Sequence, residues 1–310
     1  MSFEKRAREM GLVKMSEQEN VFMYVDRFCR VFYKQTKVAK INVLTGNPIL
    51  DENGQEMNEV LPFYGVSCTE DKDSNKEHLG GFVSDHYKFV GNETIVERAK
   101  ASILETNAPI MGEFWLMNSP RNTRFEYRFG IQHGGQNIPE IGEIIPQITL
   151  NNSYDGTGTE KLAFGLFFTD ETNKGTHITF RTKLGSFSQI HTARAKTRLA
   201  GILGSFFEIF SENIGDVVNS SVAKTLSEDE ILGTLSLVEK LAGKKRREDI
   251  SVFFHELTAG GNSMSAWHLF LAIAKFSAIE QNLNMKVIME DIAERVLVLP
   301  VRMMEALKKA

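Results

Sequence analysis

The sequence contains few of the features that mark secreted, zinc-binding or membrane proteins. Only two of its 310 residues are cysteines, Cys29 and Cys68, and no Cys-x-x-Cys spacing joins them, which argues against a disulfide framework or a thiolate zinc site. No stretch approaches the roughly 18 apolar residues of a membrane span, and no apolar segment follows the basic N-terminus as in a signal peptide. We therefore expect a cytoplasmic protein that does not enter a membrane.

Complete catalytic motifs are absent as well. The chain has no Gly-x-Ser-x-Gly, no phosphate-binding Walker loop, no dinucleotide fingerprint and no His-Glu-x-x-His. His255-Glu256 comes nearest to the last of these, but the second histidine of the motif is missing. We therefore assign no catalytic residue, no metal ligand and no cofactor, and favour a protein without enzymatic activity.

Three carboxylates leave one enzymatic alternative open. Asp155, Asp170 and Glu171 flank a predicted strand and could converge on Mg²⁺, which binds a few carboxylates together with water. Asp155-Gly156 is equally a turn-forming pair, which favours a solvated turn, and nothing supplies the rest of a nuclease site. A metal-dependent nuclease is therefore our third hypothesis.

The residue patterns typical of strands and helices indicate an α+β protein with a central antiparallel sheet. In residues 124–129 aromatic and charged side chains alternate, as on a half-buried antiparallel strand. Helical spacing follows over about 193–218, and the capping box of Ser227 and Glu230 begins the next helix. We expect a central, mostly antiparallel β-sheet with flanking helices and a helical C-terminal third. A soft boundary separates residues 1–192 from 193–310, and a single domain also fits. Further strands are predicted at 109–117, 143–150, 161–168 and 176–182, and further helices at 251–257, 263–281 and 285–299.

The N-terminal region gives more local predictions. Ser16-Glu17-Gln18-Glu19 has the capping-box pattern, and the apolar residues of 21–32 follow at helical spacing, which predicts an amphipathic helix over about 17–34. Segments 40–50 and 55–61 flank Asp51-Glu52-Asn53-Gly54, whose Asn-Gly pair predicts a β-hairpin. A polar loop is expected over 69–77 and a helix after Asn92.

The net charge of −4 conceals two basic islands. The first basic island is the acid-free stretch 172–207, and the second is the run from Lys244 to Arg247, whose place at a helix end explains it through the helix dipole. On a strand Arg181 and Lys183 share a face, and on a helix Arg194 and Arg198 lie four apart. Such a concentration of charge suits phosphate contacts, although a solvated face paired with carboxylates elsewhere would look the same. The first island carries the candidate nucleic-acid-binding residues Lys174, Arg181, Lys183, His191, Arg194, Lys196 and Arg198, with His177 nearby.

Aromatic residues near the first basic island have two explanations. Tyr154, Phe180 and Phe187 could stack on unpaired bases, a contact worth roughly 1–3 kcal/mol per base. They could equally belong to the hydrophobic core.

Two motifs resemble a family of phage- and plasmid-encoded proteins known only as a domain of unknown function. Leu-Gly-Gly-Phe-Val-Ser-Asp-His-Tyr-Lys-Phe-Val-Gly-Asn at 79–92 is one, and Asn-Asn-Ser-Tyr-Asp-Gly-Thr at 151–157 is the other. The strand 164–168, His191-Thr192 and Ala266-Trp267 are similar too, so that the resemblance covers about residues 65–285. The chain departs from the family at 169–175, where the family has Arg-x-x-Cys-x-Asn-Gly. The resemblance implies a mobile-element protein often found with replication and recombination genes, and it implies no reaction.

Together these observations give a leading hypothesis and two alternatives. The leading hypothesis is a phage DNA-metabolism protein in the host cytoplasm. It binds single-stranded DNA through the first basic island and protects or anneals the strand. A homo-oligomer is compatible with this hypothesis. The second is a non-enzymatic phage assembly or host-interaction protein, with helix 17–34 and the C-terminal helices as partner surfaces. The metal-dependent nuclease is the third.

Overall fold

The chain divides into two compact units in its computed structural model. Unit 1 comprises residues 1–95, 119–124 and 152–159, and unit 2 comprises 96–118, 125–151 and 160–310. The boundary predicted near residue 193 lies outside the described residues and stays a prediction. The structure describes residues 3–297 except 10, 17–19, 26, 43, 46, 70, 85–86, 88–89, 105–107, 119–122, 133–134, 139–141, 156–159, 169–175, 180–185, 190–209, 211–214 and 260–263.

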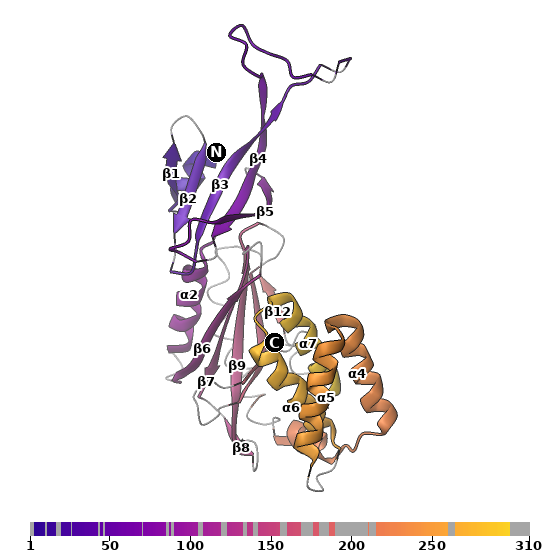
Figure 1. The fold of residues 1–310 in the computed structure, drawn as a ribbon. Coiled ribbons are helices and arrows are strands. Elements are labelled where there is room, and N and C mark those ends of the chain that lie inside the picture. Colours follow the sequence, from indigo (N-terminus) through magenta and orange to yellow (C-terminus); the bar gives the residue numbers. More distant parts are fainter. Residues whose placement is uncertain are drawn as a thin grey trace. The chain divides into compact units, whose positions relative to one another are not determined.

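Unit 1 contains a five-stranded antiparallel sheet in the order β1-β2-β3-β4-β5 (Figure 1). The short helix α1, Phe3–Glu9, precedes it. One face of the sheet is buried, and Phe22, Tyr33 and Val66 lie on it. The strands are β1 (Val13–Ser16), β2 (Val21–Val25), β3 (Arg30–Ala39), β4 (Asn58–Thr69) and β5 (Glu77–Ser84).

The helix predicted over 17–34 is wrong, because this stretch supplies β2 and the first half of β3. Phe22 pairs with Tyr33 across the two strands, and Ser16 ends β1 instead of capping a helix. The apolar residues of 21–32 fit a period of 3.6, but they are also the aromatic and β-branched types that fit a pleated surface. Pairing of β3 with the distant strand β4 decides between the two, and a local pattern does not contain that information.

The predicted hairpin is present in a modified form. The turn at 51–54 is confirmed: Gly54 has a φ of 76° and donates a backbone hydrogen bond to the Asp51 carbonyl. Of the two flanking strands, residues 58–61 of the second belong to β4. The described residues of 40–56 form isolated bridges instead, Ile41 with Pro48 and Leu50 with Glu56. The polar loop before β5 is confirmed.

Unit 2 is built on a seven-stranded sheet in which every strand pair is antiparallel. Its order is β11-β10-β9-β7-β6, with β8 beside β9 and β12 beside β10. The strands predicted in this region are confirmed, and residues 180–182 of the last one lie outside the described residues. Their bounds are β6 (Ile110–Met117), β7 (Arg124–Ile131), β8 (Gln136–Ile138), β9 (Gly142–Ser153), β10 (Glu160–Phe168), β11 (Thr176–Thr179) and β12 (Ser186–Gln189).

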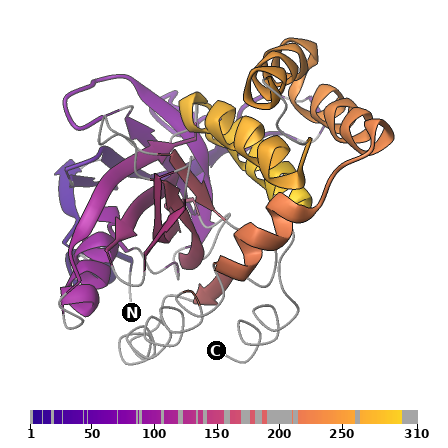
Figure 2. The same ribbon diagram turned by 90° about the horizontal axis from the view of Figure 1, so that it is seen from below.

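Helices cover both faces of this sheet (Figures 1 and 2). On one face lies α2 (Asn92–Leu104), the helix predicted after Asn92, whose Lys100 ammonium lies 5.6 Å from the centre of the Tyr127 ring. On the other face Arg128 of β7 bonds to Glu290 of α7. The prediction that β7 is half-buried is therefore wrong: Glu126 is 1% and Arg128 0% exposed, because a helix far along the chain covers the charged face.

The C-terminal third is helical, as expected. The capping box of Ser227 and Glu230 is present at the start of α4, and Gly243 ends that helix. Phe168 of β10 packs on Trp267 and Phe270 of α6 with ring centroids 6.0 and 6.1 Å apart. The α+β class is thus confirmed, and no helix within the described residues is long and apolar enough to span a bilayer. The helices are α4 (Glu228–Ala242), α5 (Lys244–Thr258), α6 (Ala266–Ile279) and α7 (Leu283–Val296).

Substitution of Gly165 in β10 tests whether the β11 backbone lies as close to this residue as the structure shows. A Cβ at this position would lie 1.8 Å from the Ile178 carbonyl oxygen, a backbone atom held by strand pairing. We expect Gly165→Ala to lower the free energy of unfolding by roughly 1–3 kcal/mol through overpacking. Gly233→Ala in α4, where the new Cβ meets nothing within 4 Å, is the matched control and should raise it by about 0.5–1 kcal/mol. Denaturant unfolding measures both, and a neutral Gly165→Ala would contradict the close approach.

Candidate functional site

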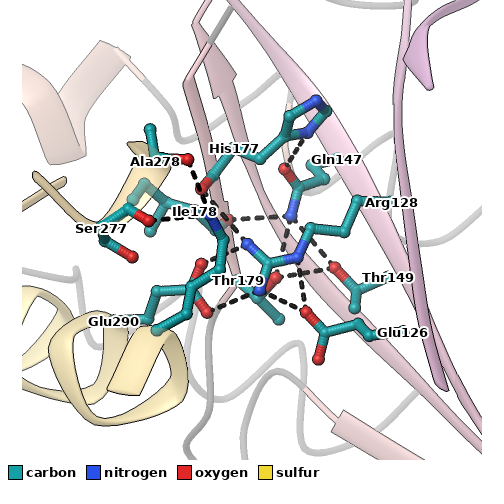
Figure 3. Close-up of polar contacts among 11 residues, drawn as sticks. Glu126, Arg128, Gln147, Thr149, His177, Ile178, Thr179, Ser277, Ala278 and Glu290 are labelled. Carbon is teal, nitrogen blue, oxygen red and sulfur yellow. Dashed lines mark hydrogen bonds and ion pairs between the residues drawn. The ribbon is translucent and has the colours of Figure 1, made fainter. Parts of the chain in front are cut away.

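A buried ionic network lies between the sheet of unit 2 and α7, centred on Arg128 (Figure 3). The Arg128 Nε donates to Glu126 Oε1 at 2.5 Å, and its two terminal nitrogens donate to the two carboxylate oxygens of Glu290. One terminal nitrogen also donates to the His177 carbonyl oxygen at 3.3 Å. One guanidinium therefore joins β7, α7 and the backbone of β11, a use that suits its planar fork of donors.

A second set of bonds links β9 to β11 beside Arg128. The Gln147 side-chain nitrogen donates to the Ile178 carbonyl at 3.2 Å and to the hydroxyls of Thr149 and Thr179 at 3.0 Å each. These two hydroxyls share a further bond of 2.7 Å. The His177 Nδ1 lies 2.7 Å from Gln147 Oε1. Since β9 and β11 each pair with β10 and not with one another, these side chains tie them across the intervening strand.

Lys286 adds a second buried cation from α7. Its Nζ donates to the carbonyls of Ser277 and Ala278 in the last turn of α6, at 2.8 and 3.1 Å, and lies 5.2 Å from the centre of the Phe114 ring. Lys286 and Glu290 are four residues apart, so they share one face of α7, and both are at most 1% exposed. Sequence reasoning missed this face, because a Lys and a Glu at this spacing usually mark a solvated helix surface.

His177 lies neutral in this environment. Burial, with help from the charges of Arg128 and Lys286, lowers the pKa of His177 from 6.5 to about 3. Its ring packs on Phe167 with centroids 4.4 Å apart. The nearby Gly112 carbonyl opposes this shift of the pKa only in part. Sequence reasoning placed His177 with the first basic island, but it carries no charge at neutral pH.

The contacts of the network suit a structural role that holds the backbone in place. Both carboxylates of Glu126 and Glu290 accept bonds from Arg128, and no nucleophile with a free base adjoins them in the described part of the site. No group of three metal-ligating side chains occurs within the described ranges either. What the arrangement does is fix the backbone of β11, because two of its carbonyls, those of His177 and Ile178, accept bonds from buried side chains.

The strand fixed in this way lies within the first basic island. Along one edge of β10, β11 pairs with residues 165–168 and β12 pairs with residues 160–163. The stretch 180–185 connects these two edge strands and contains Arg181 and Lys183. All seven predicted nucleic-acid-binding residues lie outside the described residues: Lys174, Arg181, Lys183, His191, Arg194, Lys196 and Arg198. Asp170, Glu171 and Phe180 lie outside them too.

The second basic island is compensated by carboxylates. Arg246 pairs with Glu280, and Arg247 with Glu239 at 3.1 Å. Lys244 lies 3.7 Å from Glu248. The dipole explanation needs a correction, because this run begins α5, where cations are disfavoured. Arg246 still reaches back to a helix C-terminus, donating to the Ala242 carbonyl of α4 at 2.9 Å.

Two residues considered for chemistry or stacking belong to the interior of unit 1. Asp155 is 5% exposed and accepts bonds from the hydroxyls of Thr123 and Ser153 at 2.7 and 2.6 Å, so the solvated-turn interpretation is wrong. Tyr154 is 0% exposed, and its hydroxyl accepts a bond from the Asn92 backbone. Neither side chain is therefore placed to bind a metal ion at the surface or to stack on a base.

The two motifs that carry the family resemblance meet in unit 1. The Asn152 side chain donates to the Val90 carbonyl at 2.9 Å and to Asn92 Oδ1 at 2.8 Å. The Tyr87 hydroxyl donates to the Ser153 carbonyl at 2.7 Å. The segments 79–92 and 151–157 therefore hold one another through hydrogen bonds. Comparison with known protein families, with curated proteins and with solved structures finds no match to this chain.

Glu290→Gln tests the ionic network. The change keeps the shape of the side chain but leaves the buried cations Arg128 and Lys286 with one carboxylate fewer. Breaking a buried pair in this way should lower the free energy of unfolding by about 3–5 kcal/mol. Glu256→Gln, on the exposed surface of α5, should change it by less than about 0.5 kcal/mol. Equal losses in denaturant unfolding would contradict the network's role.

The lowered pKa of His177 predicts a loss of stability in acid. Below pH 6.5 the unfolded chain takes up a proton on His177, whereas the folded protein does not until about pH 3. Stability is therefore complete above pH 6.5 and falls by about 1.4 kcal/mol per pH unit below it, or about 2 kcal/mol by pH 5. His177→Gln should remove this part of the pH dependence in unfolding titrations. The exposed His255→Gln should not, and an unchanged slope in His177→Gln would refute the assignment.

Proposed function

We propose that the protein binds single-stranded nucleic acid through the first basic island, and that it serves DNA metabolism of a mobile element by protecting or annealing strands in the host cytoplasm. The observation that carries the proposal is the absence of any acidic residue between Glu171 and Glu208, a stretch with six lysines and arginines. A polyanion is the partner that such a stretch attracts.

The fold supports this use of the island. Residues 180–185 are bounded by β11 and β12, and both strands pair with the same edge of β10. Buried side chains of β7 and β9 hold the backbone of β11 in addition to its strand pairing. A segment with both ends fixed on a rigid sheet loses less conformational entropy when it binds a ligand than a free segment would.

The contrast between the two basic islands also supports the proposal. Three of the four cations in the second island have carboxylate partners within 4 Å, which come from Glu239, Glu248 and Glu280. The first island contains no carboxylate of its own, so no residue within the stretch can neutralise its charges. Cations that are not already paired release more counterions when they bind phosphates, and this release drives association.

Stacking contributes less to this proposal than the charges do. Tyr154 is buried within unit 1, which removes one of the three aromatic residues considered. Binding should therefore rest on phosphate contacts and show little sequence preference. The resemblance of segments 79–92 and 151–157 to proteins of phages and plasmids favours DNA as the polymer.

Fluorescence anisotropy with a labelled oligonucleotide tests the proposal. A length of about 30 nucleotides exceeds a single-stranded site of about 4–16 nucleotides. Replacing Arg194, Lys196 and Arg198 with Ala should weaken binding at low salt. It should also reduce the slope of log affinity against log salt by about 2, since each phosphate contact on a single strand contributes about 0.7.

The matched control removes three exposed cations elsewhere. Lys240, Lys244 and Lys245 lie on α4 and α5, and their replacement with Ala should leave both affinity and slope near the wild-type values. An equal effect of the two triple variants would point to net charge alone, and no binding at low salt would defeat the proposal. Degradation of the oligonucleotide that requires Mg²⁺ would instead establish the nuclease alternative.

A further inference from the structure

A hairpin arm projects from unit 1 with side chains that its own fold does not bury. The arm comprises residues 36–62, formed by the ends of β3 and β4 and the loop that joins them (Figure 1). Every described residue from 37 to 60 except Ala39 is exposed. Val38, Ile41, Leu44, Leu50 and Val60 are among them, and Leu44 is 95% exposed. Apolar side chains gathered on one exposed element mark an interaction site.

Among the described residues, no strand pairs with either edge of the arm beyond its base. β2 accompanies β3 only as far as Lys34, with a further bond from the Gln35 backbone to the Asn20 carbonyl. β5 accompanies β4 only from Phe63 onward. Beyond these points residues 37–39 pair with residues 58–60 alone among the described residues, and the Lys40 backbone donates to the Met57 carbonyl. A two-stranded ribbon is marginal by itself in water, and its outward N–H and C=O groups are available for another strand.

The two edges carry opposite charges. Lys37 and Lys40 lie on the β3 side, whereas Glu56 and Glu59 lie on the β4 side. Lys37 is opposite Val60 and Glu59 is opposite Val38, so Lys37 and Glu59 point to opposite faces of the ribbon. Within the described part of the chain no ion pair joins any of these four residues, although they lie on paired segments.

We propose that the arm binds a second copy of this chain, with the β3 edge of one arm pairing with the β4 edge of the next. This order places Lys37 and Lys40 beside Glu56 and Glu59 and continues the antiparallel alternation of strands. Pairing of two β3 edges would place lysines beside lysines, and pairing of two β4 edges would place glutamates together. Pro62, which has no N–H, ends the open row of donors at the base of the arm.

A contact between two different edges is head-to-tail. Repetition of such a contact gives a closed ring if the rotation between copies closes, and a filament if it does not. The exposed apolar side chains would then pack between neighbouring arms. This inference does not depend on nucleic-acid binding, since the arm and the first basic island are separate stretches of the chain.

Charge exchange on the arm tests this pairing, with the full-length protein and without DNA. Sedimentation analysis should show concentration-dependent association of the wild type. The variant Lys37→Glu/Lys40→Glu and the variant Glu56→Lys/Glu59→Lys should each associate at least about tenfold more weakly, because like charges replace opposite ones at four positions. An equimolar mixture of the two variants should associate again, since each then supplies the charge that the other lacks.

Two controls make the outcome decisive. Lys37→Arg/Lys40→Arg retains the charge and should associate as the wild type does. Circular dichroism and thermal unfolding of all variants should match the wild type, because the four residues are exposed. A wild type that is monomeric at every concentration would overturn the proposal. So would undiminished association of either charge variant, or failure of the mixture to restore association.

Discussion

The arrangement of unit 2 depends on burying the charge of Arg128. A guanidinium inside a protein is very unfavourable unless it is paired and hydrogen-bonded, and this one is satisfied from three directions: by Glu126 on its own strand, by Glu290 on α7 and by the His177 carbonyl on β11. An apolar contact would allow α7 to shift along the sheet. The bidentate ion pair with Glu290 allows one position, so the network specifies how the helix lies on the sheet.

The Arg128 network also constrains β11. Four residues of this strand are described, and the pairing of four residues with β10 would be weak alone. Two of its carbonyls accept hydrogen bonds from buried side chains, and a neutral His177 packs on Phe167 of β10. The stretch that leaves β11 belongs to the first basic island. The stretch that we propose to bind nucleic acid thus follows directly from a strand whose backbone is held by buried side chains, a common relation between scaffold and binding loop.

Much of the fold was predictable from sequence, but little of the site was. Strands such as 161–168 show in their local composition, and the capping box at Ser227 is a local signal that the structure retains. The helix expected over 17–34 failed because β3 obtains its strand partner from β4, a non-local pairing. The Arg128 network was missed for the same reason. Its ion pair joins residues 162 positions apart, and each partner alone has the sequence pattern of a solvated surface.

The charges of the arm differ from those around Arg128 in their exposure and pairing. In unit 2 charges that resemble surface residues are buried and paired within one chain. On the arm no ion pair joins the opposite charges within the described part of the chain, although they lie on paired segments of one hairpin. Exposed apolar side chains occur on the same element. Lys37 and Glu59 point to opposite faces of the ribbon, so the arm does not pair these two charges by itself. The contact that we propose with a second copy would bury the apolar groups and pair the charges.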